Sequence, residues 1–207
     1  MISAEGMSRP ALRRLLRQCR RALSAHQQAI AARKLYRQLA QHAAFRRARR
    51  IAFYLPNDGE IDPRPLMREA QRRGKRTYLP VLKPWPRTRM VFQQVRRGER
   101  LFPNRFRIPE PRPRPARQRA AWMMDLLLMP LVGFDEAGGR LGMGGGFYDR
   151  SLAFLQRRRH GSQHPRLLGL AHGCQRVDRL PLASWDIPLH ATVTDEGWYP
   201  RHSRESR

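Results

Sequence analysis

The sequence predicts one α/β domain with three layers, in which a mainly parallel sheet is flanked by helices on both faces. Apolar stretches typical of buried strands alternate along the chain with stretches of helical periodicity. The 207 residues are enough for one full core, and the sequence shows neither an internal repeat nor a linker that divides it. We expect the domain to span residues 8–196, with flexible termini at 1–7 and 197–207.

Two amphipathic helices are expected to form a hairpin at the N-terminus. Apolar side chains recur at helical spacing over residues 8–23, and Arg9 and Arg13, four residues apart, share one face of that helix. Ser24-Ala-His-Gln27 is a capping box, which predicts the start of the second helix.

Six stretches are predicted to be strands because they are rich in apolar residues and are bounded by turn residues. In chain order, they cover residues 51–55, 77–81, 90–95, 126–134, 167–171 and 191–194. A helix is expected from Pro63 to Arg73, since proline favours a first helical turn and Gly74 favours a helix end. Residues 102–119 contain five prolines, so we expect a long irregular loop there.

The composition limits the classes of protein and partner. Lys and Arg number 42 against 16 acidic residues, and the net charge of +26 favours anionic partners such as nucleotides or RNA. Only three of these cations are lysines, so the excess of arginine can also reflect genomic base composition.

No apolar run approaches the ~20 residues of a membrane-spanning helix, no secretory leader is evident, and Cys19 and Cys174 suggest no disulfide framework. We expect a cytoplasmic monomer.

The most informative stretch is Arg-Leu-Gly-Met-Gly-Gly-Gly-Phe-Tyr-Asp at 140–149, between an apolar strand and a predicted helix at 147–157. Glycines let the backbone adopt positive φ and approach a ligand, and the unpaired N–H groups of a helix start attract anions. Arg140 adds a forked cation, and Asp149 adds a hard oxygen of the kind that binds magnesium. The stretch therefore predicts a phosphate site, although a glycine-rich turn without a ligand is a common alternative. It matches neither the Walker A motif nor the dinucleotide fingerprint.

Other candidate residues are ambiguous when taken alone. Glu60 follows the turn after the first strand, and ligands of open α/β sheets gather at the carboxyl ends of strands. By composition, however, Glu60 can equally be a surface turn residue. Asp186 can be a turn or cap residue, and Arg9 and Arg13 can belong to a solvated basic face.

The glycine-rich stretch, extended to Arg150 and preceded by Met-Pro-Leu-Val-Gly-Phe-Asp at 129–135, resembles the motif of the 5-formyltetrahydrofolate cyclo-ligases, also called 5,10-methenyltetrahydrofolate synthetases. The resemblance runs from about residue 8 to 196 and is strongest at 126–150 and 180–194. It implies a three-layer α/β fold, ATP as co-substrate and Mg²⁺ as cofactor.

This resemblance also assigns roles to individual residues. The implied ATP-binding residues are Arg9, Arg13, Arg140, Leu141, Gly142, Met143, Gly144, Gly145, Gly146, Phe147 and Tyr148. The implied folate-binding residues are Leu55, Glu60, Phe106 and Tyr148, and the implied magnesium ligands are Asp149 and Asp186. Arg140 and Tyr148 are the expected catalytic residues. The family usually has lysine where Arg9 stands, a change that keeps the charge and alters the geometry.

The implied reaction is an ATP-driven cyclisation of 5-formyltetrahydrofolate to 5,10-methenyltetrahydrofolate, with release of ADP and phosphate. The formyl oxygen attacks the γ-phosphate, and N10 then attacks the phosphorylated intermediate. Such chemistry needs aligned substrates and stabilised phosphoryl charge rather than a protein nucleophile.

Two alternatives stay open, an RNA-binding basic protein and another nucleotide-dependent α/β enzyme. Glu60 and the segment at 185–186 would not be needed by a generic phosphate binder.

Overall fold

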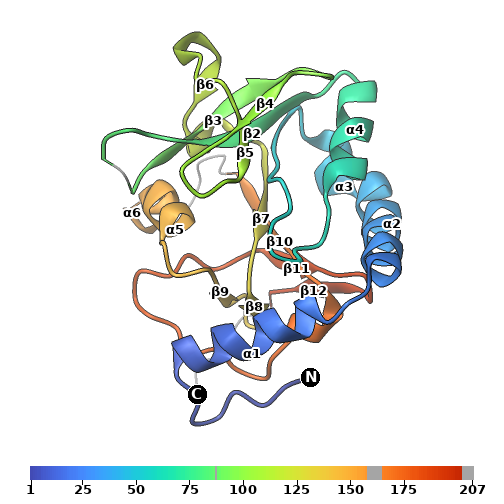
Figure 1. Ribbon diagram of the computed structural model, residues 1–207, viewed down its shortest axis with the longest axis vertical. Helices are drawn as coiled ribbons and strands as arrows, with labels where there is room; N and C mark the ends of the chain where they lie inside the picture. The colour runs from blue at the N-terminus through green and yellow to red at the C-terminus, as the bar shows by residue number, and fades with distance from the viewer. Residues whose placement is uncertain (87, 158–164, 202–207) are drawn as a thin grey trace.

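A computed structural model describes residues 1–86, 88–157 and 165–201 of the chain. Its centre is an eight-stranded sheet in the order β12-β11-β10-β7-β1-β2-β3-β6 (Figure 1). The strands of this sheet are β1 (Arg50–Ala52), β2 (Arg76–Leu82), β3 (Met90–Val95), β6 (Gln118–Arg119), β7 (Leu126–Pro130), β10 (Arg166–Leu170), β11 (Ala191–Val193) and β12 (Trp198–Pro200). The five strands from β11 to β2 run parallel, and the edge strands are antiparallel, which confirms the expected mainly parallel sheet.

Helices cover both faces of this sheet. The helices are α1 (Arg9–Arg21), α2 (Ala25–Gln41), α3 (Ala43–Arg47), α4 (Arg64–Arg72), α5 (Phe147–Leu152) and α6 (Phe154–Arg157). Short 3₁₀ turns are η1 (Pro115–Arg117), η2 (Ala121–Met123) and η3 (Gly173–Gln175). In Figure 1, α2, α3 and α4 lie on one side of the sheet, α5 and α6 lie on the other, and α1 crosses below. The three-layer α/β prediction is therefore confirmed.

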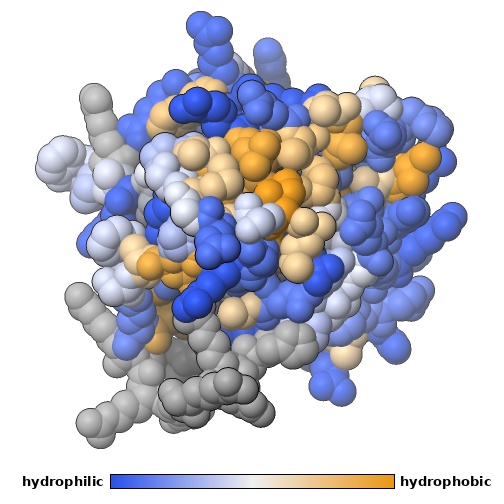
Figure 2. Space-filling model, turned by 90° about the horizontal axis from the view of Figure 1, so that it is seen from below, coloured by the Kyte–Doolittle hydropathy of each residue, from blue (hydrophilic) through white to orange (hydrophobic). Residues whose placement is uncertain are grey.

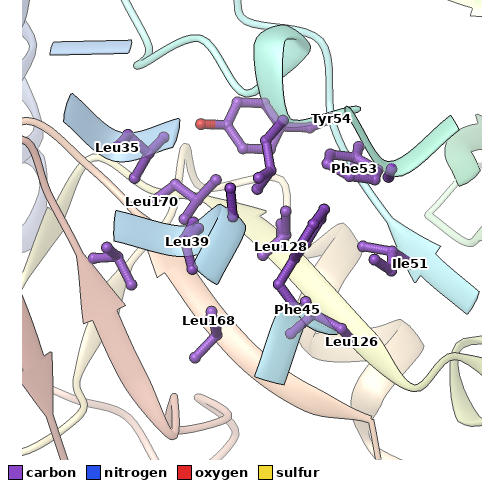
Figure 3. Close-up of a cluster of buried hydrophobic side chains, with 14 of the residues drawn as sticks. Leu35, Leu39, Phe45, Ile51, Phe53, Tyr54, Leu126, Leu128, Leu168 and Leu170 are labelled. Atoms are coloured by element: carbon purple, nitrogen blue, oxygen red, sulfur yellow. The ribbon is translucent and has the colours of Figure 1, made fainter. Parts of the chain in front are cut away.

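The packing of the core explains why the sequence of β7 is an uninterrupted run of apolar residues. Successive strand residues point to opposite faces, and both faces of this sheet are covered. Leu126 and Leu128 pack with the side chains of α2 and α3, among them Leu39 and Phe45 (Figure 3). Leu127, in contrast, packs in the cluster under α5. A strand buried on both faces cannot show the polar alternation of a surface strand.

The first two helices begin as the sequence predicts. The Ser8 hydroxyl accepts a hydrogen bond from the N–H of Ala11 at the start of α1. At the start of α2, the Gln27 N–H donates to the Ser24 hydroxyl, and the Ser24 N–H donates to the Gln27 side chain at 2.8 Å. This reciprocal pair is the expected capping box.

The expected irregular loop at 102–119 is wrong in part. Two short strands, β4 (Leu101–Pro103) and β5 (Pro109–Pro111), pair as an antiparallel ribbon within it, and β6 joins the main sheet. Prolines are tolerated here because strands with a free edge do not need every N–H group. The side chain of Asn104 also orders the turn, since its oxygen accepts hydrogen bonds from the N–H groups of Phe106 and Ile108.

Parts of both terminal segments form contacts with the domain. The N–H of Ala4 donates to Asp178 at 2.9 Å, and Ile2 forms a bridge with Val177, so part of segment 1–7 packs on the domain. Near the C-terminus, β12 pairs with β11 and belongs to the main sheet. The expected flexibility of the termini stays a prediction, and 202–207 lie outside the described residues. Figure 2 looks onto the face formed by α1 and the termini, where hydrophilic residues predominate.

The boundaries of two other elements differ by a few residues from those expected from the sequence. The strand expected at 51–55 ends at Ala52, although the Phe53 N–H still donates to the carbonyl oxygen of Tyr78 at 2.9 Å. The helix expected at 147–157 is divided at Ala153 into α5 and α6. Within the described residues, no helix is long and apolar enough to cross a membrane.

Candidate active site

The carboxyl ends of β1, β2 and β7 open onto a cavity of about 790 Å³. Its walls come from α1, the loop after β1, the β4–β5 ribbon, the glycine loop before α5 and the segment before β11. With one exception, all the site residues expected from the sequence line it, namely Arg9, Arg13, Leu55, Glu60, Phe106, Arg140, Gly142, Met143, Gly144, Gly145, Gly146, Phe147, Tyr148, Asp149 and Asp186. Segments more than 170 residues apart in sequence thus meet at one edge of the sheet.

Leu141 is the exception. Arg140 and Leu141 form the short strand β9, which pairs with β8 (Gly133–Phe134). Neighbouring strand residues point to opposite faces, so Arg140 faces the cavity while the Leu141 side chain is buried against Leu12 and Leu16 of α1. The Leu141 side chain therefore contributes to the packing beneath the loop, and the expected role of Leu141 in ATP binding stays a prediction that only its backbone could fulfil.

The glycine loop takes a shape that other residues disfavour. Gly144 and Gly146 have φ of +97° and +61°, and Gly146 stands directly before α5. Arg13 of α1 crosses the loop and donates from Nε to the carbonyl oxygen of Gly142 at 2.8 Å. A basic side chain therefore holds the loop whose amides are expected to face phosphate. Burial is the main cause that lowers the pKa of Arg13, assisted by the charge of Arg9.

Gly146→Ala is expected to lower the free energy of unfolding by about 1–2 kcal/mol, because φ is positive there. Gly74→Ala is the matched control, since Gly74 has φ of +70° and an added Cβ would meet nothing within 4 Å. Both variants should lose similar stability in thermal unfolding, and only Gly146→Ala should also weaken nucleotide binding in calorimetry. Equal nucleotide affinity in the two variants would contradict a ligand role for the loop.

Arg140 is a buried cation whose side chain is 4% exposed. Its Nη2 donates to Asp149 Oδ1 at 2.6 Å, and the guanidinium lies 5.7 Å from the ring centre of Tyr148. Its Nε is buried and has no hydrogen-bond partner among the described residues. A buried donor without an acceptor is costly, but Arg176 Nε has the same property, so the suitability of Arg140 for a phosphate rests on its charge and on its place in the cavity lining. Gly142 leaves room for the guanidinium, because an added Cβ would lie 3.0 Å from Nη1.

Asp186 is held by Arg9 and lies next to Ile187, whose N–H is 3.4 Å from Asp149 Oδ1. Arg9 Nη1 and Nη2 donate to the two carboxylate oxygens of Asp186 at 2.5 and 3.1 Å, and the Ala183 N–H donates at 2.8 Å. Burial acts to raise the pKa of Asp186, but the hydrogen bonds from Arg9 and Ala183 outweigh it and lower the pKa. Asp186 therefore presents a charged carboxylate to the cavity.

The two expected magnesium ligands fit that metal through their chemistry. Magnesium is bound by hard oxygens and usually takes one or two carboxylates together with water and substrate phosphates. Asp149 and Asp186 both line the cavity, and each is paired with an arginine. In the part of the chain that the structure describes, no group of three or more His, Cys, Asp or Glu side chains could hold a metal alone. The donor set thus suits a metal that arrives with a phosphate.

Glu60 lies in the loop after β1, and its side chain is 11% exposed. The Asn57 N–H donates to its Oε2 at 3.2 Å, and Arg20 Nη1 lies 3.9 Å from its Oε1. Burial raises the pKa of Glu60 to about 7, although the charge of Arg20 acts in the opposite direction. Burial also raises the pKa of Tyr148, so this expected catalytic phenol is neutral and suited to hydrogen bonding.

Aromatic side chains form the mouth of the cavity. Phe106 is 51% exposed and meets the Phe147 ring edge-to-face, with ring centres 5.8 Å apart. Trp185 is 67% exposed and also lines the cavity, next to Asp186. Exposed rings around a cavity are suited to flat aromatic ligands.

Sequence analysis missed one residue that contacts several walls of this site. Arg20 of α1 is fully buried and contacts Asp58, Leu131 and Met143. A signal was present, because Arg20 follows Arg13 by seven residues and therefore shares its helical face. Spacing alone does not reveal that this arginine is buried.

Comparisons with known proteins show similarity over almost the whole chain. A model of the 5-formyltetrahydrofolate cyclo-ligase family matches residues 5–195. The 5-formyltetrahydrofolate cyclo-ligase of Escherichia coli (strain K12) is 41% identical over 180 residues, covering 87% of this chain and 96% of the relative. The enzyme of the same name from Haemophilus influenzae is 37% identical over 181 residues, covering 87% and 94%. The NMR structure of Aquifex aeolicus 5,10-methenyltetrahydrofolate synthetase has a TM-score of 0.80 at 28% identity, covering 97% of this chain and 96% of that one. The chain therefore belongs to the 5-formyltetrahydrofolate cyclo-ligase family.

Proposed function

We propose that this chain, an enzyme of the cyclo-ligase family, converts 5-formyltetrahydrofolate to 5,10-methenyltetrahydrofolate with hydrolysis of ATP to ADP and phosphate. The observation that carries the proposal is the shared cavity. It holds the buried carboxylate of Glu60 on one side and the pair Arg140–Asp149 with the glycine loop on the other. The reaction needs such a site, because one substrate must be held beside the phosphates of the other.

The folate is proposed to bind on the side of Glu60. A carboxylate can accept hydrogen bonds from two neighbouring N–H groups of a pterin ring. Leu55 supplies an apolar contact, and Phe106 stands at the mouth for the aromatic part of the substrate. Because Glu60 is buried, its hydrogen bonds to the ring are sheltered from water and can select the pterin by its pattern of donors.

ATP is proposed to place its phosphates on the glycine loop and beside Arg9, Arg13 and Arg140. Arg140 supplies a cation with forked donors that lines the cavity next to the glycine loop. Magnesium would be held by Asp149 and Asp186 and would neutralise phosphate charge. The arginines paired with these carboxylates keep them in place before the nucleotide binds.

The proposed reaction has two displacement steps. The formyl oxygen of the folate attacks the γ-phosphorus, and the bond to the β–γ bridging oxygen breaks to release ADP. N10 then attacks the formyl carbon and loses its proton to solvent, the ring closes, and the carbon–oxygen bond breaks as phosphate leaves. Arg140 stabilises the negative charge of the transferring group, and the neutral Tyr148 hydroxyl is positioned beside it as a hydrogen-bond donor.

A direct assay tests this function. Purified protein is mixed with 5-formyltetrahydrofolate, ATP and magnesium, and formation of the methenyl product is followed by its absorbance band. We expect product only when both ATP and magnesium are present, with one ADP released for each methenyl group. A folded protein that forms no product, or that forms it without ATP, would refute the proposal.

We also propose that the enzyme works as a monomer in the cytoplasm, where ATP is available. The support is that a single chain supplies every group that the reaction needs, from both walls of one cavity. Light scattering at assay concentrations tests the monomer. A dimer that dissociates with loss of activity would contradict it.

A second candidate function, RNA binding, is favoured by one observation. The strand register brings basic residues together at the amino edge of the sheet, opposite the cavity. Arg50 of β1 is paired in register with Arg76 of β2, and Arg166 of β10 lies at the same edge. Arg49 is exposed there, and Asp125 is its acidic neighbour. Strand β7 lies between β1 and β10, and Asp125 directly before it pairs with Arg50 at 3.7 Å. The basic residues therefore form an edge of net positive charge that can attract phosphates.

The RNA candidate is tested by a charge-matched pair of variants. In the first variant, three arginines of the amino edge are changed to glutamine, namely Arg49, Arg76 and Arg166. In the second variant, the same change is made at three exposed arginines of α1 and α2, namely Arg14, Arg33 and Arg37. We expect only the first set to reduce the salt dependence of binding to a single-stranded RNA, by a slope of about 2. Equal losses in both variants would indicate unspecific attraction to the whole charge.

A further inference from the structure

Arg20 connects the two substrate sides of the cavity. Arg20 lies in the last turn of the amphipathic helix α1. Its side chain is fully buried although it is charged. Nε donates to the carbonyl oxygen of Asp58 at 2.7 Å, and Nη2 donates to the Asp58 carboxylate at 2.9 Å. Nη1 donates to the carbonyl oxygen of Leu131 at 3.1 Å, and Nη2 lies 3.8 Å from the sulfur of Met143.

These contacts belong to three different walls. Asp58 is in the loop after β1 that carries Glu60, Leu131 follows the carboxyl end of β7, and Met143 is in the glycine loop. All three nitrogens of the guanidinium are used, in a planar arrangement that a lysine ammonium cannot reproduce. One side chain therefore fixes the loop on the folate side relative to the loop on the phosphate side.

The loop that carries Glu60 also packs closely on α1. Gly59 has φ of +76°, and an added Cβ would lie 3.1 Å from the carbonyl oxygen of Arg20. On its other side, His172 Nε2 lies 3.2 Å from the Gly59 carbonyl oxygen. The backbone next to Glu60 is thus clamped between α1 and the segment after β10.

Arg20 is also the nearest cation to the Glu60 carboxylate. The other titratable groups that act on or respond to Glu60 are Asp58 in the same loop, and the phenols Tyr54 and Tyr148. The charge of Asp58 does not depend on Arg20 alone, because Arg17 and Arg21 also bind it. Burial acts to raise the pKa of Asp58, but hydrogen bonds from these three arginines lower it to about 2.

We propose that Arg20 is a positioning residue for the folate, which fixes the loop of Glu60 against the glycine loop and favours the charged form of the Glu60 carboxylate. This inference rests on the proposed function, because it gives Glu60 the role of pterin contact. Arg20 itself does not line the cavity and touches no reacting atom. It acts through Glu60 and through the relative placement of two loops.

The test compares Arg20→Lys with Arg17→Lys. Arg17 binds the same Asp58 carboxylate at 2.8 Å, but its side chain is 35% exposed, and Glu60, Leu131 and Met143 are not among its hydrogen-bond or ion-pair partners in the described chain. We expect Arg20→Lys to raise the KM for 5-formyltetrahydrofolate about tenfold or more, with a smaller change in the KM for ATP. Arg17→Lys should leave both constants near the wild-type values. A purely structural role would reduce the amount of active enzyme and leave the KM unchanged.

A second measurement does not depend on turnover. The Glu60 carboxyl is titrated by NMR in protein with ¹³C-labelled glutamate and without substrate, in the wild type, Arg20→Lys and Arg20→Met. We expect the Glu60 pKa to rise most in Arg20→Met, which removes the charge, and less in Arg20→Lys. If the assay fails while Glu60 titrates as expected, the proposed function fails, and with it the folate role of Arg20, while the effect of Arg20 on the Glu60 carboxylate is supported. An unchanged Glu60 titration together with an unchanged folate KM would overturn the inference.

Discussion

Arg140→Lys is expected to lower kcat by about two to three orders of magnitude while the protein remains folded. The positive charge is kept, and an ammonium can still pair with Asp149. The planar fork is lost, however, and with it the buried Nε donor that has no acceptor within the described residues. The loss should therefore concern the transferring phosphate, where charge develops, more than binding of the folate.

Steady-state kinetics and thermal unfolding together check this result. The matched control is Arg176→Lys, because Arg176 also forms an ion pair, with Glu136, and lies over the Tyr199 ring away from the cavity. The control should keep wild-type turnover. Near wild-type kcat in a folded Arg140→Lys variant would show that any cation suffices at this position, and the proposed role of the fork would have to be abandoned.

The site was largely predictable from sequence because most of its groups lie in one short stretch. Glycines, a cation and a carboxylate at 140–149 have a local chemical meaning that does not depend on distant contacts. The same contiguity does not reveal that the Leu141 side chain is buried, because alternate residues of a strand point to opposite faces. A motif identifies the segment, while its backbone conformation decides which side chains face the site.

The groups that sequence reasoning missed depend on tertiary contacts. Arg20 has the sequence context of a surface arginine, and its burial depends on distant acceptors, namely the carbonyl oxygens of Asp58 and Leu131 and the Asp58 carboxylate. The strands β4, β5 and β12 were missed for a related reason. Each has three residues, and such short strands are stabilised by a partner strand rather than by their own propensity. Long amphipathic helices and the buried central strands carry their own pattern, so they were predicted correctly.

Glu60→Gln is expected to stabilise the folded protein at pH 8 by up to about 3 kcal/mol and to change its stability little at pH 4. The folded state raises the pKa of Glu60 to about 7 from its ordinary value of 4.5, chiefly through burial. Below pH 4 the carboxyl is protonated in both the folded and the unfolded state, so it contributes nothing. Between pH 4.5 and about 7 only the unfolded chain loses the proton, and the wild type therefore becomes less stable as pH rises.

Glutamine removes this titration and keeps an oxygen that can accept from the Asn57 N–H. Urea unfolding at pH 4 and pH 8 measures the difference, with Asp178→Asn as a control of opposite sign. Hydrogen bonds from the N–H groups of Ala4 and Arg179 lower the pKa of Asp178, so that variant should lose more stability at pH 8 than at pH 4. A stability difference for Glu60→Gln that does not vary with pH would contradict the burial argument.

The same variant should bind the folate more weakly, because a neutral amide is a poorer acceptor than a carboxylate for the pterin N–H groups. A gain in stability combined with a loss of affinity would indicate that the folded protein carries the cost of a buried carboxylate for the sake of its substrate.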